Sequence, residues 1–185
     1  MIIGLTGRSG SGKSTASCIF KEHGAYIINA DKIGHDILHG EAHDEVLQEF
    51  GACILNEIGG IDRKKLAEVV FNDEGALKRL NEITHPKITI EIKRLIAGKE
   101  LVCIDAALLY EADIDSLCDV VISFHADTET LISRIAKRDG ISASLARKRI
   151  NAIMEKRGDI VILNDCEYDE FSKKIIEIIK RLVQQ

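Results

Sequence analysis

Residues 7 to 14 read Gly-Arg-Ser-Gly-Ser-Gly-Lys-Ser and match the pattern G-x-x-x-x-G-K-[ST] at every fixed position. Glycines at this spacing let a loop turn its backbone N–H groups inward around phosphate oxygens. Lys13 would reach the β- and γ-phosphates of a nucleoside triphosphate, and the Ser14 hydroxyl would bind Mg²⁺. The motif therefore predicts a nucleotide site made of Gly7, Arg8, Ser9, Gly10, Ser11, Gly12, Lys13, Ser14 and Thr15.

The residues on either side of this loop have the expected patterns. An apolar run at 2–6 predicts a strand, and 14–23 has a helical pattern that ends at Gly24. The helix start would direct its positive dipole end toward the phosphates. A guanine-reading N-K-x-D sequence is absent, and the D-x-x-G match at 31–34 is short, so a GTPase is disfavoured. We predict ATP-dependent phosphoryl transfer, with Lys13 facing the ligand rather than packed.

Two aspartates follow predicted strands and could act on the acceptor or the metal. Asp31 comes just after the second apolar run, 25–29, and Asp105 ends the third, 101–104. In a doubly wound sheet, ligands bind at the carboxyl ends of the strands. Asp31 could accept the proton of an attacking hydroxyl or bind the metal, or it could cap a helix that begins at Lys32. Asp105 could belong to the Mg²⁺ shell or simply end its strand.

Basic and histidine side chains supply further candidates. Arg134 and Arg138 lie four apart on a predicted helix and could stabilise charge on the transferred phosphate. His35, His39 and His43 would share a helix face, but Gly40 interrupts that helix, so a zinc site is disfavoured. His85 precedes Pro86, which we expect to interrupt the helical pattern of 75–97, so His85 could contact a ligand or cap the next helix.

The order of patterns along the chain predicts an α/β fold. Further short apolar runs at 120–124 and 160–163 bring the predicted strands to five. In each run the side chains that would point to either face of a sheet are apolar, which is typical of a parallel sheet buried on both faces. Residues 31–99 contain only helical patterns, far more than one crossover helix needs. A last helix is predicted over 168–183, with apolar residues at helical spacing.

Composition limits the function classes. The chain has 185 residues and a formal net charge of −5, which disfavours general nucleic-acid binding. No apolar stretch is long enough for a membrane span, and the start lacks the charged n-region of a signal peptide, so we expect a cytoplasmic protein. The five cysteines fit neither a disulfide framework nor a zinc site, and we expect Cys18 and Cys103 to be core residues.

Beyond these patterns, the chain resembles the dephospho-CoA kinase family along almost its whole length. Besides the phosphate loop, the resemblance is carried by the run at 28–34, by Leu80-Asn81, by Thr84-His85-Pro86 and by Ala107-Leu108-Leu109-Tyr110-Glu111. It implies a P-loop NTPase fold with a five-stranded parallel sheet, a helical substrate-binding insertion and a helical lid. The implied ranges are 1–30, 100–126 and 158–185 for the nucleotide-binding core, 31–99 for the CoA-binding insertion and 127–157 for the lid.

The resemblance also implies a reaction and its residues. ATP and Mg²⁺ would be used to phosphorylate the ribose 3′-hydroxyl of dephospho-CoA. The implied roles are Asp31 as base, Asn164 near the adenine, His85, Leu108 and Glu111 at the acceptor, and Ser14, Asp31 and Asp105 at the metal. A kinase for another nucleoside or nucleotide acceptor is an alternative. A lid shorter than the family's also leaves open a regulatory module that binds nucleotide without turnover.

Overall fold

The computed structural model describes residues 1–71, 73–151 and 157–183, which form two compact units. One unit comprises Met1–Asn29 and Gly98–Gln185, and the other is the intervening Ala30–Ala97. Of the lid range predicted from the sequence, residues 152–156 lie outside the described residues. Within the described ranges, no helix combines the length and the apolar character needed to cross a bilayer.

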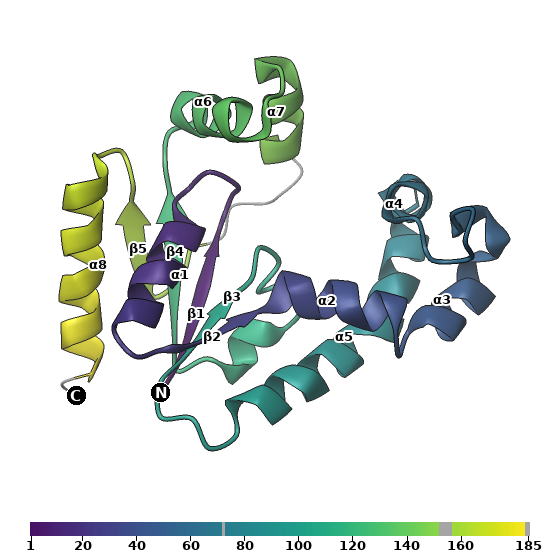
Figure 1. Ribbon diagram of the computed structural model, residues 1–185, viewed down its shortest axis with the longest axis horizontal. Helices are drawn as coiled ribbons and strands as arrows, with labels where there is room; N and C mark the ends of the chain where they lie inside the picture. Colours follow the sequence, from purple (N-terminus) through teal and green to yellow (C-terminus); the bar gives the residue numbers. More distant parts are fainter. Residues whose placement is uncertain (72, 152–156, 184–185) are drawn as a thin grey trace. The chain divides into compact units, whose positions relative to one another are not determined.

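The first unit is built on a five-stranded parallel sheet, as the sequence predicts. Its strands are β1 (Ile2–Gly7), β2 (Tyr26–Asn29), β3 (Val102–Asp105), β4 (Val120–His125) and β5 (Ile160–Leu163). They lie in the order β2-β3-β1-β4-β5, and every pairing is parallel (Figure 1). The chain therefore crosses over between strands, and all five carboxyl ends lie at one edge of the sheet.

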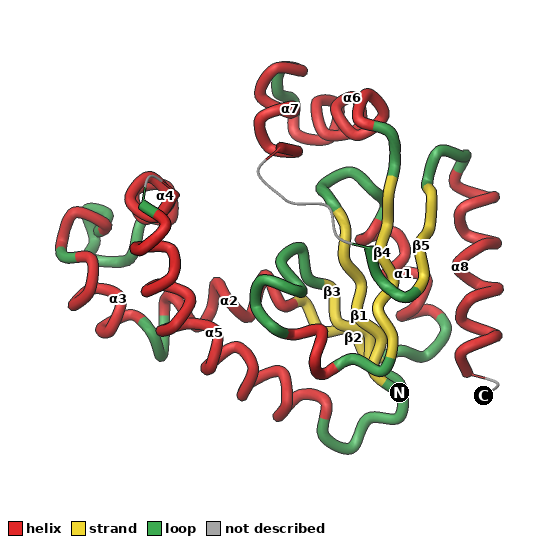
Figure 2. Tube along the Cα trace, turned by 180° about the vertical axis from the view of Figure 1, so that it is seen from behind, coloured by secondary structure: helices red, strands yellow, loops and turns green. Residues whose placement is uncertain are grey.

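Two helices cover one face of the sheet. They are α1 (Lys13–Glu22) and α8 (Tyr168–Val183), which lie beside the strands in both views (Figures 1 and 2). Their buried side chains, among them Phe20 and Phe171, share one apolar core with Leu5 and Phe124 of the central strands. This packing anchors α1 and thereby holds the start of that helix at the end of β1.

The expectation that all strands are buried on both faces is wrong for β2 and β5. These are the edge strands, and Val161 and Leu163 of β5 are 49% and 59% exposed. Cys18 is likewise exposed rather than a core residue, because it lies on the solvent side of α1, whereas Cys103 is fully buried in β3 as expected. All five cysteines are free thiols.

After β4, a helical hairpin extends from the same unit. Its helices α6 (Thr128–Asp139) and α7 (Ala143–Asn151) pack around the buried side chains of Leu131, Ile135 and Ile150. Asp127 caps α6 by accepting hydrogen bonds from the backbone N–H groups of Glu129 and Thr130. The short 3₁₀ helix η2 (Ile114–Leu117) lies between β3 and β4 in the chain.

The second unit is helical. It consists of α2 (Ala30–His39), α3 (His43–Phe50), the 3₁₀ turn η1 (Ala52–Ile54), α4 (Arg63–Phe71) and α5 (Glu74–Ile96) around its own apolar core. The predicted interruption at Pro86 is wrong, because α5 runs through it. Pro86 has no N–H to donate to the carbonyl oxygen of Glu82, four residues earlier in the helix. Both residues are exposed to water. The apolar residues that follow and precede Pro86 along α5 pack into one core and keep the helix continuous.

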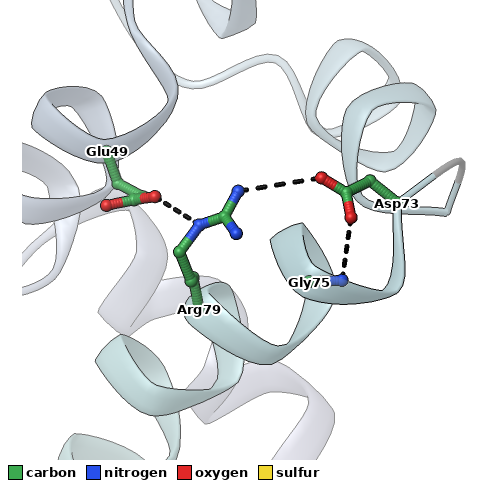
Figure 3. A network of polar contacts seen from close by, with 4 residues as sticks. All are labelled: Glu49, Asp73, Gly75 and Arg79. Carbon is green, nitrogen blue, oxygen red and sulfur yellow. Dashed lines mark hydrogen bonds and ion pairs between the residues drawn. The ribbon is translucent and has the colours of Figure 1, made fainter.

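An ion-pair network ties the start of α5 to α3. Arg79 donates from Nε to Glu49 Oε1 at 2.5 Å and lies 3.8 Å from Asp73 Oδ2, while Asp73 also caps α5 through the Gly75 N–H (Figure 3). The Arg79 side chain is 47% exposed. Because water screens such pairs, Arg79→Ala should lower the free energy of unfolding by only about 0.5–1 kcal/mol in urea denaturation.

A matched control is available one residue away. Lys78 is 79% exposed and lies 3.9 Å from Glu82 in a simple i,i+4 pair. Lys78→Ala should change the free energy of unfolding by less than about 0.5 kcal/mol. Equal losses for the two variants would show that the network adds nothing beyond an ordinary surface charge.

Candidate active site

The phosphate loop connects β1 to α1 and requires glycine at two positions. Gly7 and Gly12 have φ angles of 146° and 101°, which L side chains rarely adopt. A Cβ at Gly7 would lie 2.5 Å from the Phe124 carbonyl oxygen, and one at Gly12 would lie 2.2 Å from Asn164 Nδ2. Neither neighbour is the free end of a flexible surface chain, so a side chain at either position would force the loop open.

Lys13 and Asp105 form the central charged pair of the site. Lys13 Nζ donates to Asp105 Oδ1 at 2.5 Å, and the two side chains are 13% and 9% exposed. The pair exists because β3 lies beside β1, with Asp105 in register with Leu5. The expectation that Lys13 faces a ligand without packing is wrong in this respect, since the lysine is largely buried and already paired.

The donor set at the start of α1 fits a polyphosphate and a divalent cation. Gly12 is the N-cap of α1 and Ser14, in its first turn, is exposed, so backbone N–H groups and a hydroxyl face outward together. Asp105 adds a carboxylate, the hard oxygen ligand that Mg²⁺ prefers. Thr15, also in the first turn, is half-buried.

Three side chains contact the phosphate loop from α6 and from the segment after β5. Asn164 Nδ2 donates to the Ser11 carbonyl oxygen at 2.9 Å. Arg134 Nη1 donates to the carbonyl oxygens of Gly10 at 3.3 Å and Asn164 at 3.0 Å. Arg138 Nη2 donates to Ser9 Oγ at 3.2 Å. All three residues are predicted from the sequence, whereas their contacts are not, because these span up to 153 positions and carry no local signal.

Ser11 carries a buried hydroxyl that, among the described residues, has no hydrogen-bond partner. Such a group costs about 1–3 kcal/mol relative to a satisfied one. Ser11→Ala should therefore leave the free energy of unfolding unchanged or raise it by up to about 1 kcal/mol in urea denaturation.

Ser123 is the control for that variant. It is fully buried, and its Oγ accepts a hydrogen bond from the Gly158 N–H at 2.9 Å. The same Oγ also forms a hydrogen bond with His125 Nε2 at 2.9 Å. Ser123→Ala should lower the free energy of unfolding by about 1–3 kcal/mol. A destabilised Ser11→Ala protein would mean that the Ser11 hydroxyl has a partner in solution.

Asp31 lies in the first turn of α2, two residues after β2 ends at Asn29. The reading of Asp31 as an N-cap is wrong, because the helix already begins at Ala30. Asn29 itself is in register with Asp105, so the chain leaves the sheet for α2 beside the carboxylate that binds Lys13. At the first turn, a carboxylate also interacts favourably with the helix dipole.

The histidines spaced four residues apart, His35, His39 and His43, do not share one helix. His35 and His39 lie on α2 with ring centroids 4.5 Å apart, whereas His43 begins α3. Burial lowers the pKa of His39, and the neighbouring His35 and Arg63 lower it further. In the part of the chain that the structure describes, no group of three or more potential metal ligands is found.

The predicted acceptor residues lie on both units. His85 is inside α5, so it cannot cap a helix that begins after Pro86, and that alternative is wrong. Burial lowers the pKa of the half-buried His85 and so favours its neutral form. Leu108, 49% exposed, and Glu111 lie in the turns between β3 and η2 of the first unit.

Comparison with known proteins places this arrangement in one family. The family model described as dephospho-CoA kinase matches residues 1–170. A dephospho-CoA kinase of Geobacter sulfurreducens is 40% identical over 191 residues, covering 96% of each chain. The dephospho-CoA kinase of Fusobacterium nucleatum subsp. nucleatum is 39% identical over 183 residues, covering 95% of each chain.

Solved structures agree with the sequence matches. The chain is similar to a dephospho-CoA kinase from Campylobacter jejuni, with a TM-score of 0.68 and 29% identity over 98% of this chain and 96% of that one. A shikimate kinase from Acinetobacter baumannii, at 16% identity and a TM-score of 0.53, shares only the fold, over 97% of this chain and 93% of that one. Because the family model spans residues 1–170 and relatives that are 39% and 40% identical cover at least 95% of both chains, this chain belongs to the dephospho-CoA kinase family.

Proposed function

We propose that this chain transfers the γ-phosphoryl group of ATP to the ribose 3′-hydroxyl of dephospho-CoA, giving CoA and ADP, the last step of coenzyme A biosynthesis. The observation that carries the proposal is the family match over residues 1–170, which includes the whole phosphate loop. The buried Lys13–Asp105 pair supports it, because an acidic side chain at the end of the strand beside the loop is the arrangement that phosphoryl transfer needs.

Charge neutralisation is the main task of the nucleotide site. Backbone N–H groups of the loop and Lys13 would bind the phosphates, and Arg134 and Arg138 would balance the charge that develops during transfer. Mg²⁺, when bound by Ser14, Asp31 and Asp105, would supply further neutralisation of the phosphate oxygens. Each of the two arginines already contacts the loop at Gly10 or Ser9 and is therefore anchored near the phosphates.

Acceptor activation would fall to Asp31. A carboxylate is a weak base, but phosphoryl transfer depends mostly on positioning and charge, so orienting the hydroxyl and accepting its proton late is sufficient. We assign acceptor binding to the helical segment 31–99 with His85, together with Leu108 and Glu111. The helical segment 127–157 would act as the lid, and Asn164, which follows β5, would lie near the adenine.

Release of ADP in a coupled assay with ATP, Mg²⁺ and dephospho-CoA tests the proposal. We expect turnover with dephospho-CoA and none above background with nucleosides or nucleoside monophosphates. Turnover with a nucleoside monophosphate but not with dephospho-CoA would overturn the acceptor assignment. ATP binding without transfer to any acceptor would instead identify a nucleotide-binding module without turnover.

A further inference from the structure

The side-chain amide of Asn164 is buried and donates a hydrogen bond to the phosphate loop. Asn164 is 94% buried, being only 6% exposed, and its Nδ2 lies 2.9 Å from the Ser11 carbonyl oxygen. Only the NH₂ end of an amide can face a carbonyl oxygen, so this contact also sets the orientation of the amide. A Cβ added to Gly12 would lie 2.2 Å from the same nitrogen, which shows how closely the amide approaches the loop.

The backbone of Asn164 is fixed as well. Its N–H donates to the His125 carbonyl oxygen at 2.7 Å, and its own carbonyl oxygen accepts from Arg134 Nη1 at 3.0 Å. Arg134 also donates to the Gly10 carbonyl oxygen, so Arg134 and Asn164 bind the consecutive loop carbonyls of Gly10 and Ser11. The two residues are themselves joined by the hydrogen bond from Arg134 to the Asn164 carbonyl oxygen. Asn164 is thus a rigid support rather than a side chain that is free to turn toward a ligand.

Because a trans peptide is planar, the position of the Ser11 carbonyl oxygen fixes the direction of the Gly12 N–H. In the Ser11–Gly12 peptide, the carbonyl oxygen and the N–H point in opposite directions. Holding the Ser11 oxygen toward Asn164 therefore turns the Gly12 N–H away from Asn164. Gly12 is also the N-cap of α1, so that N–H belongs to the set of backbone donors at the helix start that suits an anion.

We propose that Asn164 is a positioning residue for phosphate binding: it orients the Ser11–Gly12 peptide and does not read the adenine ring. This rests on the proposed nucleotide-binding function and assigns Asn164 a role in polyphosphate affinity. It predicts that Asn164 matters equally for ligands with and without a base, because the group that it orients contacts only phosphate.

Isothermal titration calorimetry with ATP and with inorganic tripolyphosphate separates the two roles. Asn164→Leu keeps the branched shape of the side chain but removes the donor, and Asn164→Ala removes the whole amide. We expect each variant to bind both ligands about tenfold more weakly than the wild-type protein, with the ratio of the two affinities unchanged. Cys166→Ser, two residues along the same segment, is the control and should bind both within twofold of wild type.

Several results would overturn the assignment. Weakened ATP binding with unchanged tripolyphosphate binding would show that Asn164 reads the base, and unchanged binding of both would show that it has no role. Circular dichroism melting checks that the variants are folded, and the shape-matched leucine serves if alanine does not fold. No acceptor is present in the titrations, so a wrong acceptor assignment would not affect them, whereas a wild-type protein that binds neither ligand would overturn this inference together with the nucleotide site.

Discussion

Asp31→Asn should lower kcat with dephospho-CoA by about 10²–10⁴-fold while leaving the affinity for ATP within a few-fold of wild type. Asparagine keeps the shape of the side chain but cannot accept the proton of the attacking hydroxyl. The stability cost should be small, about 0.3–1 kcal/mol, because Asp31 is exposed in the first turn of α2 and the interaction of such a carboxylate with the helix dipole has this magnitude. Steady-state kinetics with both substrates, together with thermal unfolding, measure these effects.

The same helix provides the control. Asp36 lies on α2 with its side chain 63% exposed and 3.5 Å from His35 Nδ1. Asp36→Asn should retain full kcat, since surface pairs of this kind contribute little. A kcat for Asp31→Asn within threefold of wild type, or a loss equal to that of Asp36→Asn, would show that Asp31 is not the base.

Lys13→Ala should lower kcat by about 10²–10³-fold or more, because in the proposed function this lysine would neutralise charge on the transferred phosphate. It should also destabilise the protein by about 1–3 kcal/mol, since the Asp105 carboxylate, 9% exposed, loses its partner at 2.5 Å. A lysine that faces the ligand rather than packs, as the sequence predicts, would lose activity without losing stability, whereas the buried Lys13–Asp105 pair adds a loss of stability.

The double variant Lys13→Ala/Asp105→Asn separates the two effects. Replacing the carboxylate by a neutral amide removes the unpaired buried charge, so the free energy of unfolding should recover most of its loss while kcat stays as low as in Lys13→Ala. Urea denaturation and the ADP-release assay on the same preparations give both numbers. A double variant as unstable as Lys13→Ala would show that the lysine stabilises the protein by packing rather than by charge.

The fold could be predicted from the sequence because its signals are local. A strand buried on both faces must be apolar at consecutive positions, as Val121 and Ile122 of β4 show. The motif at 7–14 requires the strand–loop–helix context that β1 and α1 provide. The elements were predicted to within two residues in most cases. The bounds of the edge strands β2 and β5 were predicted equally well, but their exposure was not, since a four-residue apolar run does not reveal which strand lacks a neighbour.

At Pro86 and Cys18 the structure differs from what the neighbouring residues in the sequence predict. Proline removes one hydrogen bond from a helix, but α5 has apolar side chains packed on both sides of the proline, and their burial keeps the helix continuous. Cys18 has apolar neighbours in sequence, yet its angular position on α1 directs it to solvent. In both cases the deciding contacts come from other elements.

The sequence by itself determined the class of chemistry and the residue types of the site: the glycines, Lys13 and Ser14 of the loop, and the acidic residues that end strands. The tertiary structure decided which of these groups are paired. Lys13 meets Asp105 and Ser11 meets Asn164 only because the strand order β2-β3-β1-β4-β5 brings segments 92 and 153 residues apart to one end of the sheet. Strand order depends on the packing of whole faces, which local periodicity does not encode.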